Sequence, residues 1–312
     1  MHGVTSPSDT VAALLAPLVE GKRLVRELDE PLRESAPLAF EIAHSTCADE
    51  DCCTYHSMWQ YLRLAGIHRG LQVDGPLFVA AAERMAGDGA LNRALVSGTA
   101  DYSILAHIAH GARRGGANPS FQVVDQCATT LRMNQWYGAR RGFSVTTFRS
   151  DIFAFRPEAR YDLICTHAFL GFHSFADRPM LFQRWAEWLA PGGRLCFSNT
   201  VSDQPIPADI EGRKKRIAEK TAKGLRLLAE QGVPLPCPQP RFEELVRQFG
   251  LRQEERGPAM SLETVCSWIE DAGLDLEIAV PVKKALPGEP DLPAFSDRGP
   301  ERPRIWFQAR RP

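Results

Sequence analysis

The stretch Ala94-Leu-Val-Ser-Gly-Thr-Ala-Asp-Tyr-Ser-Ile-Leu-Ala-His-Ile-Ala109 decides the fold of this chain. It is an apolar strand that runs through one glycine, Gly98, into an amphipathic helix. A second strand follows and ends in an acid, in Phe121-Gln-Val-Val-Asp125. Open α/β sheets hold a ribose-bearing cofactor with such a turn and acid, at the carboxyl ends of their strands. The stretch therefore predicts a nucleoside site.

Short apolar strands and helices continue to alternate on both sides of this unit, which indicates βαβ units and a parallel sheet. Strands are expected over 94–97, 121–125, 145–148, 161–166, 194–199, 274–280 and 304–309, and helices over 102–113, 129–140, 178–189 and 261–272. Pro191-Gly-Gly193 predicts a helix stop and a tight turn before the fifth strand. Residues 281–303, rich in proline and charge, predict a surface connector.

The flanking segments are helical. Helices are expected over 9–18, 32–43, 55–65 and 76–85, and a helical pair over 208–250 is interrupted by the prolines of 234–240. The predicted organisation is a helical region over residues 1–90 and an α/β domain over 91–312. A helical insert lies at 205–258 of that domain.

Composition bounds the class of protein. With 312 residues, of which 44% are hydrophobic, the chain can bury one large core, or one core and a smaller helical subdomain. The net charge of −1 gives no support for a nucleic-acid partner. Because no signal peptide or long apolar run is evident, we expect a cytoplasmic protein without a membrane partner. The eight cysteines are expected to be reduced.

The order of the segments resembles the class I S-adenosylmethionine-dependent methyltransferase fold over residues 93–309. Four matches carry the resemblance: the turn after the first strand, Asp125, Ser150-Asp-Ile152, and Leu189-Ala-Pro-Gly-Gly-Arg-Leu195. It implies an α/β, doubly wound, mostly parallel seven-stranded sheet whose last strand is antiparallel. It also implies S-adenosylmethionine as cofactor and the amino-terminal helices as a lid over a small-molecule acceptor.

The first turn departs from the family pattern of three glycines preceded by an acid. Only Gly98 remains, with Val96, Ala100 and Tyr102 at the other places. Alanine still permits a close approach of a ligand to the backbone, and Asp101 is expected to supply polar contacts. The alternative is a plain joint between strand and helix, with Asp101 as the helix cap. The turn residues predicted to bind cofactor are Ser97, Gly98, Thr99, Ala100, Asp101 and Tyr102.

The acid after the second strand is the second predicted cofactor element. A carboxylate at Asp125 can accept hydrogen bonds from both ribose hydroxyls. A nicotinamide dinucleotide would suit the same geometry, but the glycines that cradle a pyrophosphate are missing. The resemblance places Asp151 at the adenine amino group. The remaining predicted cofactor residues are Gln126, Cys127, Ser150, Ile152 and His167.

Three residues are predicted as possible bases. His167 ends the fourth strand, where the resemblance places groups that face the methyl group and the acceptor. A histidine there can remove a proton near neutral pH, although methyl transfer can also proceed by alignment alone, with His167 as a pocket wall. Tyr55 and His56, on the lid helix, are the other candidates.

A cluster of cysteine and histidine precedes that helix and includes Cys47, Cys52, Cys53 and His56. It suggests a metal, but adjacent cysteines do not easily bind one ion and the spacing matches no strong zinc pattern. We therefore predict no metal, and instead an acidic helix start at 49–51.

The sequence thus predicts a methyltransferase for a small molecule, with a homodimer as a further expectation and the acceptor atom undetermined between oxygen, nitrogen and sulfur. Two alternatives stay open. The degenerate turn also suits other chemistry on the same cofactor, such as cyclisation or transfer of another group. The third candidate is a non-catalytic, nucleoside-binding or regulatory module.

Overall fold

The computed structural model describes residues 30–71, 74–203, 210–252, 260–282 and 303–312. Within these ranges the strands form one seven-stranded sheet in the order β3-β2-β1-β4-β5-β7-β6. β7 is antiparallel to both neighbours, and β1 to β5 pair in parallel. This confirms the predicted doubly wound, mostly parallel sheet. Its strands are β1 (Arg93–Ser97), β2 (Ser120–Asp125), β3 (Val145–Arg149), β4 (Tyr161–His167), β5 (Leu189–Thr200), β6 (Asp275–Pro281) and β7 (Arg304–Arg310).

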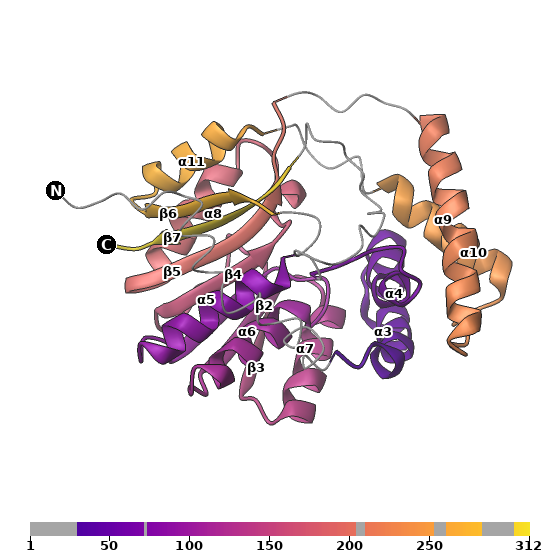
Figure 1. The fold of residues 1–312 in the computed structure, drawn as a ribbon, viewed down its shortest axis with the longest axis horizontal. Helices are drawn as coiled ribbons and strands as arrows, with labels where there is room; N and C mark the ends of the chain where they lie inside the picture. The colour runs from indigo at the N-terminus through magenta and orange to yellow at the C-terminus, as the bar shows by residue number, and fades with distance from the viewer. Residues whose placement is uncertain (1–29, 72–73, 204–209, 253–259, 283–302) are drawn as a thin grey trace, which may run out of the picture.

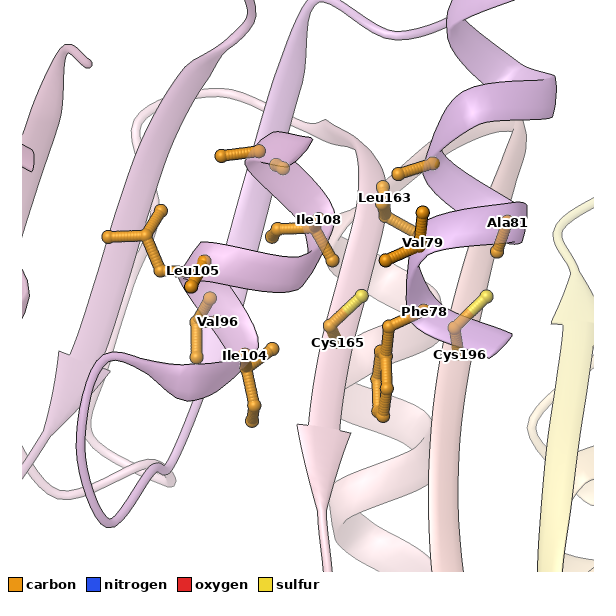
Figure 2. Packing of buried hydrophobic residues seen from close by; sticks show 14 of the residues in the cluster. Phe78, Val79, Ala81, Val96, Ile104, Leu105, Ile108, Leu163, Cys165 and Cys196 are labelled. Atoms are coloured by element: carbon orange, nitrogen blue, oxygen red, sulfur yellow. The ribbon is translucent and has the colours of Figure 1, made fainter. Parts of the chain in front are cut away.

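Helices cover both faces of the sheet (Figure 1). One face holds α5 (Gly75–Gly87), α6 (Ser103–Arg114) and α7 (Ala128–Arg141), and the other holds α8 (Arg178–Trp188) and α11 (Leu262–Asp271). Strand side chains alternate between the two cores, so that Val96 faces the first and Leu95 the second. Figure 2 shows Val96, Leu163 and Cys165 beside the apolar side chains of α5 and α6.

A third core lies to one side of the sheet. It is built by α3 (Leu32–Thr46), α4 (Glu50–Leu64), α9 (Ile210–Glu230) and α10 (Gln239–Arg252), which gather together in Figure 1. Met58 and Leu62 of α4 pack there with Ile217 and Phe242 of the insert. The amino-terminal helices and the insert therefore form one unit. By contrast, α5 packs on the sheet, although it belongs to the predicted helical region of 1–90.

Two local expectations differ from the structure. The helix expected from Tyr55 begins at Glu50, because the side chain of Asp49 accepts a hydrogen bond from the Cys52 amide at 2.7 Å. Pro191-Gly-Gly193 lies inside β5 instead of before it, with a register shift against β4. The helix expected over 9–18 and nearly all of the 281–303 connector are outside the described residues. In the described part of the chain, no helix combines the length and apolar character of a membrane span.

Candidate functional site

The first turn lies at the point where the sheet order reverses, between β1 and β4. Open α/β sheets bind their ligands at this point, beyond the carboxyl ends of the strands. Gly98 follows β1 with a φ of 67°, and its amide donates to the Val124 carbonyl at 3.0 Å. A Cβ at this position would approach the Phe169 ring to 2.2 Å. Both the backbone angle and the packing therefore require glycine here.

Asp125 is held at the same turn by two backbone amides. Its Oδ2 accepts from Thr99 N at 3.1 Å and its Oδ1 from Cys127 N at 2.8 Å. Each oxygen keeps a further lone pair for a ligand. Burial raises the pKa of Asp125, while the amides of Cys127 and Thr99 oppose that shift.

Asp151 stands at the end of the neighbouring strand. Its Oδ1 accepts a hydrogen bond from Phe153 N at 2.8 Å, and its Oδ2 accepts one from the side-chain Nε2 of Gln126 at 2.5 Å. The amide of Ser150 donates to the Asp125 carbonyl at 3.0 Å, and Ile152 is buried in the core. The structure thus brings Asp125, Gln126 and Asp151 together at one edge of the sheet, as parallel strands require.

Other residues of the turn predicted to bind cofactor contact side chains and backbone groups inside the protein. Ser97 accepts a hydrogen bond from Trp185 Nε1 at 3.0 Å, and Tyr102 stacks on Tyr137 at 4.6 Å. The Oδ1 of Asp101 accepts from the amide of Ser103 at 2.8 Å, at the start of α6. For Ser97, Asp101 and Tyr102, these contacts fit the alternative hypothesis that the turn only joins strand to helix, with Asp101 near the start of the helix.

The other oxygen of Asp101 contacts α4. Arg63 of α4 donates to Asp101 Oδ2 at 3.0 Å and to both oxygens of Glu30, at 2.8 and 2.9 Å. The Arg63 side chain is fully buried. Asp101 therefore joins α4 to the β1–α6 turn through an ion pair.

His167 lies in a polar cluster at the ends of β4, β5 and β7. Its Nε2 is 2.8 Å from Asp74 Oδ2, which also accepts from Ser198 Oγ at 2.6 Å and from Arg304 Nη1 at 3.0 Å. Arg304 also contacts His167 Nε2. Asp74, Ser198 and Arg304 were not predicted from the sequence. Strand register brings Ser198 and Arg304 to His167, since His167 pairs with Ser198 and Arg304 with Thr200, and Asp74 is added from the residue before α5.

The charges and the burial of this cluster set the protonation states of Asp74 and His167. Burial alone would raise the pKa of Asp74, but Arg304, His167 and Ser198 hold it well below its usual range. Burial and Arg304 lower the pKa of His167. At neutral pH the cluster is thus a carboxylate beside a neutral imidazole. A hydrogen on Nε2 would be accepted by Asp74 and would leave the Nδ1 lone pair available, whereas the Arg304 donor at the same nitrogen favours a hydrogen on Nδ1.

The two candidate bases on α4 have different surroundings. Tyr55 packs in an aromatic group, 5.4 Å from Trp59 and stacked at 5.5 Å on Phe249 of α10. His56 Nδ1 lies 3.4 Å from the carbonyl of Ala100, and its ring is hydrogen-bonded to Cys127. Tyr55 therefore belongs to the contact between lid and insert, and His56 to the contact between lid and cofactor turn.

Three thiols meet beside His56. The sulfur atoms of Cys47, Cys52 and Cys127 all lie within 4.8 Å of one another. The sequence analysis judged a metal from the spacing within 44–63 alone. The third thiol follows Asp125 in a distant segment, so local spacing could not reveal it.

Comparisons with known proteins were made on sequence and on structure. The sequence matches no protein-family model and no curated protein. Among solved structures, the N-methyltransferase NodS from Bradyrhizobium japonicum WM9, in complex with S-adenosyl-L-homocysteine, is 14% identical, with a TM-score of 0.44 over 88% of this chain and 98% of that one. The S-adenosylmethionine-dependent methyltransferase SibL is 18% identical, with a TM-score of 0.48 over 88% and 62%. Geranyl diphosphate methyltransferase with S-adenosylmethionine is 12% identical, with a TM-score of 0.47 over 75% and 85%.

At these identities and TM-scores, the three likenesses carry no argument about this chain. The fold itself is defined by the strand order and by the antiparallel β7 of the described sheet. It is the class I methyltransferase fold.

Proposed function

We propose that this chain is an S-adenosylmethionine-dependent methyltransferase that acts on a small-molecule acceptor. One observation carries the proposal: the Asp125 carboxylate is anchored by the Thr99 amide beside the Gly98 turn, at the reversal point of the sheet. This arrangement suits a ribose whose two hydroxyls donate to one carboxylate. The Gly98 backbone, free of a Cβ, suits a close approach of the cofactor.

The residues next to Asp125 suit the adenine of the nucleoside. Gln126 and Asp151, joined by their hydrogen bond, are proposed to face the adenine edge. Asp125 lies between them and the turn, so the three side chains follow the expected line from base to ribose. Bound S-adenosylmethionine would supply a methyl group on a positively charged sulfur.

His167 is proposed as the base on the acceptor side. Its neutral Nδ1 would take the proton that an oxygen or nitrogen acceptor loses as the new bond to carbon forms. Asp74 would hold the ring in the tautomer with its hydrogen on Nε2 and stabilise the imidazolium that results, through its 2.8 Å contact with Nε2. Arg304 and Ser198 in turn hold the Asp74 carboxylate.

Calorimetry with S-adenosylhomocysteine tests the cofactor assignment. We expect binding to the wild-type chain and a loss of about 100-fold in Asp125→Ala, since two charge-assisted hydrogen bonds disappear. Glu158→Ala, which removes an exposed acid just before β4, is the control and should bind as wild type. Absence of binding to the wild-type chain would overturn the proposal and favour a module without this cofactor.

Product analysis separates methyl transfer from other chemistry on the same cofactor. With a panel of small-molecule oxygen, nitrogen and sulfur nucleophiles, we expect release of S-adenosylhomocysteine and a product heavier by one methylene. Methylthioadenosine as the released product would instead indicate transfer of another group.

A further inference from the structure

The thiol cluster beside the cofactor turn has no part in the proposed methyl transfer. Cys47 follows the last residue of α3, Cys52 lies in the first turn of α4, and Cys127 directly precedes α7. Three separate elements thus direct a sulfur atom to one place. The neighbouring Cys53 is not a member, although it stands next to Cys52 in the sequence.

The separations between the sulfur atoms suit ligands of one ion. Cys127 Sγ lies 3.7 Å from Cys47 Sγ and 3.4 Å from Cys52 Sγ. Thiolates bound to tetrahedral zinc at ~2.3 Å are about 3.8 Å apart, whereas a disulfide needs ~2.0 Å. The thiols therefore lie close to the spacing that a shared metal imposes, without forming a covalent pair.

The surroundings favour thiolate at the centre of the cluster. Cys127 Sγ lies in contact with both of the other thiols. Cys127 and Cys52 also stand at the amino-terminal ends of helices, where the partial positive charge stabilises an anion. Thiolate is the form that binds metal.

His56 and Thr129 lie beside the three thiols. The imidazole is buried and hydrogen-bonded to Cys127, and its Nδ1 faces the Ala100 carbonyl, but neither ring nitrogen belongs to the group of ligand atoms that lie within 4.8 Å of one another. An imidazole ligand commonly contacts a carbonyl with its other nitrogen, which orients the ring. The hydroxyl of Thr129 lies 3.3 Å from Cys47 Sγ and can hydrogen-bond to that sulfur.

We propose that Cys47, Cys52 and Cys127 bind one zinc-class divalent metal ion, and that its fourth position is filled by water or by His56 after a movement of its ring. The ion would join α3 and α4 to the β2–α7 turn, two residues from Asp125. The backbone amide of Cys127 holds Asp125, whereas its sulfur faces the lid. This site does not depend on the identity of the cofactor or on methyl transfer.

Metal analysis of the whole chain tests the proposal. The reduced protein, stripped with a chelator and then loaded with zinc chloride and desalted, is expected to retain one zinc per chain. Cys52→Ser and Cys127→Ser should each lose at least tenfold in zinc affinity, and Cys53→Ser should match wild type. Failure of the wild-type chain to retain zinc would overturn the site, as would an equal loss in Cys53→Ser.

A second measurement needs no ligand variant. Cobalt(II) should give the thiolate charge-transfer and tetrahedral bands of a sulfur-rich site, and zinc should protect Cys47, Cys52 and Cys127 from alkylation in the wild-type chain. Cys53 should react equally with and without zinc. Equal alkylation of all four cysteines, or a Cys52–Cys127 disulfide that persists in the reduced and zinc-loaded protein, would contradict the proposal.

Discussion

At the residue scale, Gly98 is the position of the first turn at which both the backbone angle and the packing require glycine. Gly98 takes a positive φ and touches the Phe169 ring, whereas Ala100 and Tyr102 need neither freedom. The sequence could predict this position, because a single glycine between strand and helix marks the turn. It could not predict that Asp101 and Tyr102 face inward, because their partners Arg63 and Tyr137 belong to other elements.

Substitution of Gly98 should lower the free energy of unfolding by more than the strain of its backbone angle alone would. Gly98→Ala is expected to lower the free energy of unfolding by about 3 kcal/mol, from a strained φ and the overlap with Phe169. Gly142→Ala is a matched control with a φ of 69° and no atom near its added Cβ, and should cost about 1 kcal/mol. Urea unfolding measures both. Equal losses would show that the Phe169 contact carries no energy.

The pH dependence of turnover belongs to the same scale. Because burial and Arg304 lower the pKa of His167, the acid limb of kcat against pH should lie below ~6.5, the ordinary histidine value. Asp74 raises this pKa, so Asp74→Asn should move the limb to still lower pH. Steady-state rates over this range, measured once an acceptor is known, check both. An acid limb above ~6.5 in the wild-type chain would exclude His167 as the base.

His167→Gln supplies the corresponding test of chemistry against binding. It should lower kcat by about 100-fold or more, because a general base is removed, while S-adenosylhomocysteine still binds as to wild type. Calorimetry and steady-state kinetics on the same preparation separate the two effects. An unchanged kcat would make His167 a pocket wall, as the alignment-only hypothesis holds.

At the scale of elements, periodicity and punctuation predicted most strands and helices, but not how they meet. Short continuous apolar runs mark β1, β4 and the second half of β5, because consecutive residues of these strands are buried in the two opposite cores. The sites lie where separate elements converge. Asp74 precedes α5 and Arg304 begins β7, more than two hundred residues apart, and no local pattern links them.

The ion pair between α4 and the first turn is the element contact most open to test. Asp101→Asn should lower the free energy of unfolding by about 3 kcal/mol, because it leaves Glu30 as the charged partner of the buried Arg63. Glu83→Gln breaks the more exposed pair with Arg114 and should cost less than ~1 kcal/mol. Denaturant unfolding compares the two. Similar small losses would mean that Asp101 does not anchor the lid.

At the scale of the whole molecule, the units of the structure are its three hydrophobic cores, and one core combines segments that are distant in the sequence. The composition predicted one large core with a smaller helical part, and the patterns predicted helices both in the amino-terminal region and in the insert. That they share one core could not be predicted from the sequence, because Met58 and Phe242 belong to segments that the first five strands of the sheet separate. The third core lies beside the sheet, whereas the other two lie on its faces.

This division predicts that the lid can open without loss of the sheet. Phe242 of α10 is fully buried in the third core, so Phe242→Ala should remove about 3–5 kcal/mol of packing there. Because the sheet is enclosed by its own two cores, amide hydrogen exchange should accelerate in α3, α4, α9 and α10, while β1, β4 and β5 stay protected. Phe182→Ala, in the core under α8, is the matched control and should instead accelerate exchange in the sheet. Uniform acceleration in Phe242→Ala would show that the three cores unfold together, and the lid could then not move independently over the cofactor turn.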